Sequence, residues 1–271
     1  MSTLHQFETE LAIRAVIDGA QIVEKRSPGQ VSRWGAGRDI ITDLDTELEK
    51  RIRDILSVSG YLVVGEEFGA ADFGARDKSK PAWIVDPLDG TVNFLNGLDF
   101  FGVSVGLYED GTFPVGAVCF PRSEELFCTY GGNRALLNGR RLMHDHILPN
   151  DALVVGAFSS AKDDPVMRAK EYQLFGTIND LTSGCLRLGS IAMGICYAAA
   201  NKVNAVYGLR VRIWDVAGAL AIARYADCKI VLGACPDPTQ VNCIVGSAAT
   251  VDFILDHCQQ LGLMGSEYQV L

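Results

Sequence analysis

Hydrophobic residues recur with two different periods in the first half of this 271-residue chain. A three-to-four-residue period predicts amphipathic helices over 7–25 and 46–57, separated by a β-hairpin over 31–41. Beyond the second helix, short runs rich in β-branched and aromatic residues predict strands between turn residues. These strands are expected at 61–64, 83–85, 102–108, 113–120, 125–130 and 134–137.

From residue 148 the pattern changes to alternating strands and helices. Strands are predicted at 152–157, 203–206, 229–232 and 243–246, and helices at 165–175, 188–201, 213–226 and 249–261. A β-meander followed by an alternating region predicts a layered α/β or α+β sandwich. We therefore expect an N-terminal lobe over 1–147 and a C-terminal α/β lobe over 148–271, joined in one compact unit.

Composition and charge narrow the class of protein. Hydrophobic residues make up 48% of the chain and charged residues 21%, which allows a large core and argues against long disorder. The net charge of −9 disfavours nucleic-acid binding. No apolar run predicts a signal peptide or a membrane span, so we expect a cytoplasmic protein without membrane partners. The eight cysteines form no CxxC pair or zinc spacing, and free buried thiols are expected.

The stretch 83–94 holds the candidate chemistry. An apolar strand is expected to end at Asp86, because the following proline bars that residue from helical geometry. The carboxylates of Asp86 and Asp89 and the carbonyl of Leu88 would then surround one point, and oxygen ligands suit Mg²⁺. The N–H groups of Gly90 and Thr91 would open a short helix and can hold a phosphate. An Asp-Pro turn followed by an Asp helix cap is the plainer interpretation.

Four further acidic residues have both a plain and a functional interpretation. Glu66 and Glu67 follow an apolar strand and form either a solvated loop or part of a cation site. Asp45 either caps the second helix, as Thr42 also can, or serves the site. Asp215 heads an apolar helix as its cap, or brings a carboxylate from the C-terminal lobe to an ion held by the first lobe.

Taken together, the motifs of this chain resemble those of the inositol monophosphatase family of Mg²⁺-dependent sugar phosphatases. Three signatures occur in the family's order: Gly65-Glu66-Glu67, Asp86-Pro-Leu-Asp-Gly-Thr-Val-Asn-Phe94 and Trp214-Asp215-Val-Ala-Gly218. Two weaker ones, Asp39-x-x-Thr42-x-x-Asp45 and Leu188-Gly189-Ser190-x-Ala192, also fit. The resemblance runs from the first helix to about residue 227.

The resemblance implies a layered αβαβα sandwich, a homodimer, lithium sensitivity and hydrolysis of a small phosphorylated polyol or sugar by a water that Mg²⁺ activates. Two or three Mg²⁺ ions would be bound by Glu66, Asp86, the Leu88 carbonyl, Asp89 and Asp215. The catalytic residues would be Glu66, Asp86 and the proton-accepting pair Asp45 and Thr91. Phosphate and substrate would be bound by Asp89, Gly90, Thr91, Gly189, Ser190 and Asp215.

Several departures from the family pattern affect the expected substrate. Gly208 stands where members that prefer inositol phosphate commonly carry a glutamate, and Ile191 stands where a small residue is usual. Arg210 and Arg212 either favour a second anionic group on the substrate or face solvent. Residues 226–228 replace the family's usual Ala-Gly-Gly, and Arg38 is the nearest cation to the position of the family's lysine.

Two kinds of alternative remain open at this point. Within the phosphatases, the alternative substrates are fructose 1,6-bisphosphate, 3′-phosphoadenosine 5′-phosphate and histidinol phosphate. In a different class, the chain is a catalytically silent regulatory or binding protein on the same scaffold. The number of metals and the role of Arg210 and Arg212 are not readable from the sequence.

Overall fold

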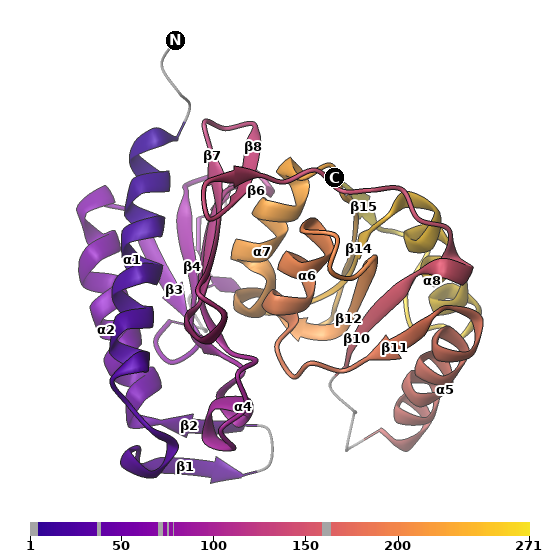
Figure 1. Ribbon diagram of the computed structural model, residues 1–271, viewed down its shortest axis with the longest axis horizontal. Coiled ribbons are helices and arrows are strands. Elements are labelled where there is room, and N and C mark those ends of the chain that lie inside the picture. The colour runs from indigo at the N-terminus through magenta and orange to yellow at the C-terminus, as the bar shows by residue number, and fades with distance from the viewer. Residues whose placement is uncertain (1–4, 37–38, 70–72, 75, 78, 159–163) are drawn as a thin grey trace.

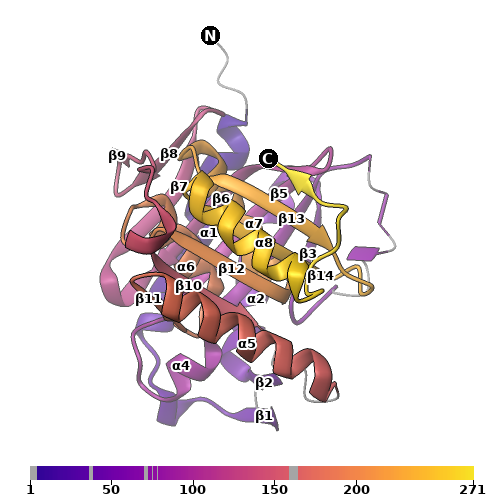
Figure 2. The same ribbon diagram turned by 90° about the vertical axis from the view of Figure 1, so that its right-hand side faces the viewer.

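The computed structural model describes residues 5–36, 39–69, 73–74, 76–77, 79–158 and 164–271. Its helices and sheets stack in five layers (Figure 1), which confirms the expected layered sandwich. Helices α1 (Gln6–Glu24) and α2 (Asp43–Leu56) cover the outer face of a seven-stranded sheet. Helices α6 (Ile191–Ala199) and α7 (Ile213–Tyr225) lie between the two large sheets. Helices α5 (Pro165–Leu181) and α8 (Ala248–Gln260) cover the second sheet (Figure 2).

The seven-stranded sheet follows the chain order from β3 to β9, and only β3 and β4 pair in parallel. Its strands are β3 (Leu62–Gly65), β4 (Ala82–Asp89), β5 (Gly102–Glu109), β6 (Thr112–Phe120), β7 (Glu125–Tyr130), β8 (Arg134–Leu137) and β9 (Arg140–Arg141). Helices cover both faces, so β4 is buried at every position. The hairpin expected at 31–41 is confirmed as β1 (Arg33–Ala36) and β2 (Asp39–Thr42). Arg38 lies outside the described residues.

The six-stranded sheet has the order β11-β10-β12-β14-β13-β15, with β10 parallel to both β11 and β12. Its strands are β10 (Leu153–Phe158), β11 (Gly184–Leu186), β12 (Ala205–Arg212), β13 (Lys229–Ala234), β14 (Gln240–Gly246) and β15 (Gln269–Val270). The sequence analysis did not expect β9, β11 and β15, because two or three residues are too few to show a period.

Strand β4 corrects one expectation about the candidate site. It does not end before Asp86 but continues through Pro87 to Asp89. The ladder with β5 pairs Asp86 with Ser104 and Asp89 with Gly102, so one extra residue forms a β-bulge between the two aspartates. A bulge tolerates Pro87, which has no N–H group to give to the ladder.

Helix α7 is apolar on all sides because it is buried between the two sheets. Small residues let it approach β5 and β6 closely. A methyl group added at Gly106, Gly116 or Gly218 would meet backbone atoms of the opposing element at less than 3.0 Å. The close packing fixes the first turn of α7, which carries Asp215, against the sheet that carries Asp86.

The remaining sequence-based expectations concern cysteines and membranes. All eight cysteines are free thiols, and six of them are buried. No helix in the described part of the chain is long and apolar enough to cross a membrane.

Candidate active site

The three main signatures meet where the first sheet borders the middle helical layer. Strands β3 and β4 are parallel with Gly65 opposite Val85, so Glu66, directly after β3, follows beside Asp86 of β4. Helix α7 packs on β4 and brings Asp215 from the second half of the chain. The candidate acidic residues therefore come from four elements: α2, the end of β3, β4 and α7.

The two aspartates of β4 are almost completely buried, at 2% exposure for Asp86 and 6% for Asp89. A carboxylate oxygen of Asp86 accepts from the backbone N–H of Leu88 at 3.0 Å, which is the Asx-type turn of the plainer interpretation. Asp89 accepts from the hydroxyl of Ser190. It does not cap the five-residue helix α4 (Thr91–Leu95), whose N-cap is Gly90 with φ +92°. Its carboxyl group instead interacts with the backbone N–H groups of Ala192 and Met193 in the first turn of α6.

Asp45 and Thr91 are joined by a hydrogen bond, as the resemblance implies for these residues. Thr91 Oγ1 lies 3.1 Å from Asp45 Oδ1 and 2.9 Å from the carbonyl oxygen of Leu88. The other carboxylate oxygen of Asp45 accepts from the backbone N–H and the hydroxyl of Thr42. Thr42 is the N-cap of α2, so the capping role belongs to Thr42 and leaves one oxygen of Asp45 facing Thr91.

Ser190 and Gly189 reach the site from the second half of the chain. Gly189 adopts φ +79°, and Ser190 is the buried N-cap of α6, where its hydroxyl also accepts from the N–H of Met193. Asn93 ties this segment to the first half, because its amide donates to the carbonyls of Phe100 (2.7 Å) and Leu188 (2.8 Å). The sequence analysis did not single out Asn93, although it stands inside the central signature.

Burial and mutual repulsion raise the pKa values of the clustered carboxyl groups. Burial raises the pKa of Asp89 to about 8, with a further rise from the charge of Asp215, against the opposing hydrogen bond from Ser190. Burial raises the pKa of Asp215 to about 7, although the N–H and charge of Arg212 oppose it. For Asp86, burial followed by the charges of Glu66 and three other aspartates, Asp89, Asp215 and Asp45, holds the pKa well above its ordinary value.

Glu66 differs from the aspartates in that its surface is exposed. Loss of solvation among the crowded protein atoms is the largest cause of its raised pKa, and the charges of Asp215, Glu67 and Asp45 follow. Water still reaches Glu66, which weakens the desolvation and leaves the repulsion from the neighbouring carboxylates. The main charges acting on Glu66 and Asp86 are thus carboxylates.

Asp215 is not the N-cap of α7, so the expectation that it caps this helix is wrong. The N-cap is Arg212, and Asp215 stands three residues later, where its carboxylate accepts from the Arg212 N–H at 3.2 Å. This position near the helix N-terminus still favours a negative charge.

The donor set fits a hard divalent cation in its chemistry. It consists of oxygen atoms only, from carboxylates whose pKa values are raised first by burial and then by mutual repulsion. Among the described residues, however, no three His, Cys, Asp or Glu side chains stand ready to hold one ion. The carboxylates therefore lie close enough to repel one another but do not surround a single point. Side-chain rotation would be needed for them to coordinate one ion.

The position of Gly208 has no room for the glutamate that inositol-selective members carry. A side chain on Gly208 would overlap Ile191 Cδ1 and come within 3.0 Å of the sulfur of Cys243. Ile191, the unusually large residue of the Gly189-Ser190 signature, therefore fills the space next to Gly208. This wall of the site is apolar.

Both arginines before Asp215 are paired with carboxylates. The side chain of Arg212 is still 44% exposed, in agreement with the solvent-facing interpretation, whereas that of Arg210 is 21% exposed. Arg210 forms an ion pair with the buried Glu171 at 2.5 Å, and Arg212 forms one with Asp237 at 2.8 Å. A second anionic group on a substrate would have to compete with these carboxylates.

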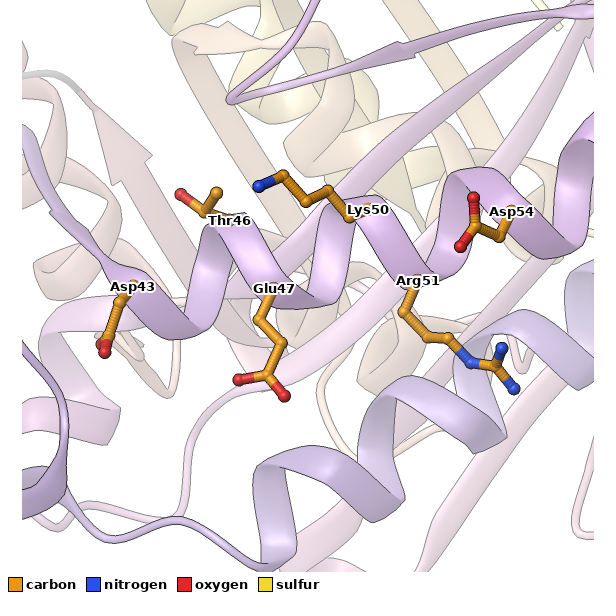
Figure 3. A pocket seen from close by; sticks show the side chains of 6 residues that line it. All are labelled: Asp43, Thr46, Glu47, Lys50, Arg51 and Asp54. Atoms are coloured by element: carbon orange, nitrogen blue, oxygen red, sulfur yellow. The ribbon is translucent and has the colours of Figure 1, made fainter.

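A surface pocket lies apart from these residues, on the outer face of α2. Figure 3 shows its six lining side chains, Asp43, Thr46, Glu47, Lys50, Arg51 and Asp54. Arg51 points to the neighbouring helix, where it forms a bidentate pair with Asp18 of α1. The pocket is a charged helix surface, and the buried Asp45 and Glu49 belong to the opposite face of α2.

Known proteins agree with the fold and with the signatures. A model of the Inositol monophosphatase family matches residues 5–261. The "Nus factor SuhB" of Pasteurella multocida is 30% identical over 224 residues, covering 80% of this chain and 81% of the relative. The "Inositol-1-monophosphatase" of Mycobacterium bovis is 31% identical over 209 residues, covering 75% and 72%. The solved structure of the extragenic suppressor protein suhB from Bartonella henselae matches the fold with a TM-score of 0.81 at 22% identity, covering 93% and 98%.

These matches, together with the layered fold, define the protein as a phosphomonoesterase. The chain belongs to the inositol monophosphatase family, and the resemblance seen in its signatures is confirmed.

Proposed function

We propose that this protein is a Mg²⁺-dependent phosphomonoesterase that hydrolyses a small phosphorylated polyol or sugar. The observation that supports this most directly is the gathering of acidic residues with raised pKa values from separate elements. Among the described residues, carboxylates are the main charges that act on Glu66, Asp86 and Asp89, and Arg212 is the cation that acts on Asp215. Such a cluster is costly to maintain unless a cation neutralises it.

The ions would be held by Glu66, Asp86, the carbonyl of Leu88, Asp89 and Asp215. Bound Mg²⁺ would supply a water of lowered pKa and would draw charge from the phosphoryl oxygens. The hydroxyl of Ser190 keeps the carboxylate of Asp89 oriented, because the two are hydrogen-bonded.

Asp45 and Thr91 would accept the proton of the attacking water. The Thr91 hydroxyl has one hydrogen and two acceptors within reach, Asp45 at 3.1 Å and the Leu88 carbonyl at 2.9 Å. When it donates to Asp45, its lone pairs can accept from water and the Leu88 carbonyl stays available to a cation. Burial raises the pKa of Asp45, which suits a group that takes up a proton.

The phosphate group would lie against the backbone at Gly90 and Thr91, with Gly189 and Ser190 on the opposite side. Gly90 is required there, since a methyl group at this residue would meet the carbonyl oxygen of Phe100 at 2.6 Å. The leaving alcohol would face the apolar wall of Ile191. On that side it would make fewer polar contacts than in a protein that has a glutamate in place of Gly208.

Release of inorganic phosphate tests this proposal. The substrates are inositol monophosphate, fructose 1,6-bisphosphate, 3′-phosphoadenosine 5′-phosphate and histidinol phosphate, each with MgCl₂ and with EDTA. We expect Mg²⁺-dependent release from at least one, and an Asp86→Asn variant should lose about a hundredfold or more in kcat. Glu47→Gln, on the outer face of α2, is the matched control and should retain activity.

A second candidate function is that of a binding protein on the same scaffold. The observation that favours it is the name "Nus factor SuhB" carried by a relative. Metal binding without phosphate release from any of the four substrates would support this candidate and refute the first. From the family resemblance we also expect two or three Mg²⁺ ions, a homodimer and lithium sensitivity. The cytoplasmic location expected from the amino-acid sequence stays a prediction.

A further inference from the structure

Glu49 is a fully buried carboxylate outside the family signatures. It lies on α2 one turn after Asp45, so the two residues share the inner face of this helix. A buried carboxylate is costly unless its oxygens are fully hydrogen-bonded, so its partners show what it does.

Those partners belong to the loop after β3. Glu49 Oε2 accepts from the backbone N–H of Glu67 at 2.7 Å, and Oε1 accepts from the N–H of Phe68 at 3.0 Å. Arg53, one turn further on α2, pairs with Glu49 at 2.8 Å and donates to the carbonyl of Val63 at 2.7 Å and to that of Phe68. The pair thus holds the backbone on both sides of Glu66.

Gly65 supplies an independent observation. Its φ is not in the left-handed region, so backbone conformation does not require glycine there. A methyl group at Gly65 would overlap the carboxyl group of Glu49. The glycine before Glu66 is therefore needed to let the Glu49 carboxylate reach the loop.

We propose that Glu49 is a positioning residue that fixes the Glu66 loop and thereby the place of the Glu66 carboxylate in the cation site. This inference rests on the proposed function. Groups that orient metal ligands without touching the metal typically contribute tenfold to a hundredfold to metal affinity.

The experiment compares Mn²⁺ binding, followed by electron paramagnetic resonance of the free ion, in the wild type and three variants. In Glu49→Gln only one amide oxygen remains to accept, and Arg53 loses its counter-charge. Gly65→Ala displaces the Glu49 carboxylate without removing its charge. Glu47→Gln is the control, since Glu47 is exposed on the outer face of α2 (Figure 3). Glu47 forms an ion pair with Arg26.

We expect the Mn²⁺ dissociation constant to rise about tenfold or more in Glu49→Gln and Gly65→Ala and to stay unchanged in Glu47→Gln. Wild-type affinity in the first two variants, even with a lower melting temperature, would overturn the inference, because a purely structural role changes stability and not affinity. If Glu49→Gln does not fold, Gly65→Ala decides alone. A wild type that binds no Mn²⁺ would instead refute the proposed function, and the inference with it.

Discussion

Asp89 allows the proposed cation site to be tested without any substrate. Its pKa rises from an ordinary 3.8 to about 8, chiefly through burial. In the unfolded chain Asp89 loses its proton near pH 4, whereas in the metal-free folded protein it keeps the proton until near pH 8. The folded state therefore binds more protons across this window, and its stability must fall as pH rises from about 4 to about 8.

The size of this effect follows from the difference of about four pH units, each of which corresponds to about 1.4 kcal/mol. This gives an upper limit of about 6 kcal/mol for Asp89. Water entry and local relaxation reduce such values by roughly half, which leaves about 3 kcal/mol. The fall between pH 5 and pH 8 covers about three of these four units, so it amounts to about 2 kcal/mol. For a chain of this size, that corresponds to a melting temperature lower by on the order of 4–8 °C at pH 8 than at pH 5.

Calorimetric melting in EDTA and in MgCl₂ measures this prediction. Mg²⁺ needs the deprotonated carboxylates, so it should raise the melting temperature more at pH 8 than at pH 5. Asp89→Asn is the internal reference, because other groups also titrate in this range. The variant should show a flatter pH profile in EDTA and a smaller Mg²⁺ effect. Equal pH profiles for the wild type and Asp89→Asn would refute the assignment of the charge penalty to Asp89.

Three further predictions concern the packing around the site. Asn93→Ala should destabilise the protein by about 1–3 kcal/mol and raise KM, because the carbonyls of Phe100 and Leu188 lose the donor that joins the two halves of the site. Thermal melting and steady-state kinetics measure these two effects. Gly208→Glu should lower the melting temperature through its overlap with Ile191, and adding Ile191→Ala should recover part of the loss. Gly218→Ala should cost about 1–3 kcal/mol in urea unfolding, because the methyl group would lie 2.8 Å from a β5 carbonyl oxygen, whereas Gly176→Ala on α5, which meets nothing, should not.

The sequence predicted those parts of the site that depend on short spacings. Asp86, Leu88, Asp89 and Thr91 stand within six residues, so their proximity follows from almost any compact turn. The bulge in β4 was missed because a proline after Asp86 indicates a turn equally well. Periodicity also predicted α7 and its burial.

Pairings between distant residues were beyond the sequence. Arg210 meets Glu171 from a helix 39 residues earlier, and nothing in either segment indicates that partner. Ile191 fills the space beside Gly208 only because α6 packs on β12. Glu49 had the appearance of an ordinary helix residue, since its partners are backbone N–H groups that leave no mark in the sequence.

These distant pairings bear on the chemistry because hydrogen bonds and ion pairs within the protein already stabilise some of the clustered negative charges. Only the remaining repulsion between carboxylates is left for a bound cation to relieve. Asp45 and Glu49 are held in place by hydrogen bonds from threonines, backbone N–H groups and an arginine. Asp86 and Glu66 have mainly carboxylates as charged neighbours, so their repulsion remains. On the proposed function, part of the cation's binding energy must remove protons and overcome that repulsion. Affinity should then be modest at neutral pH and increase with pH, because fewer protons compete for the same oxygens.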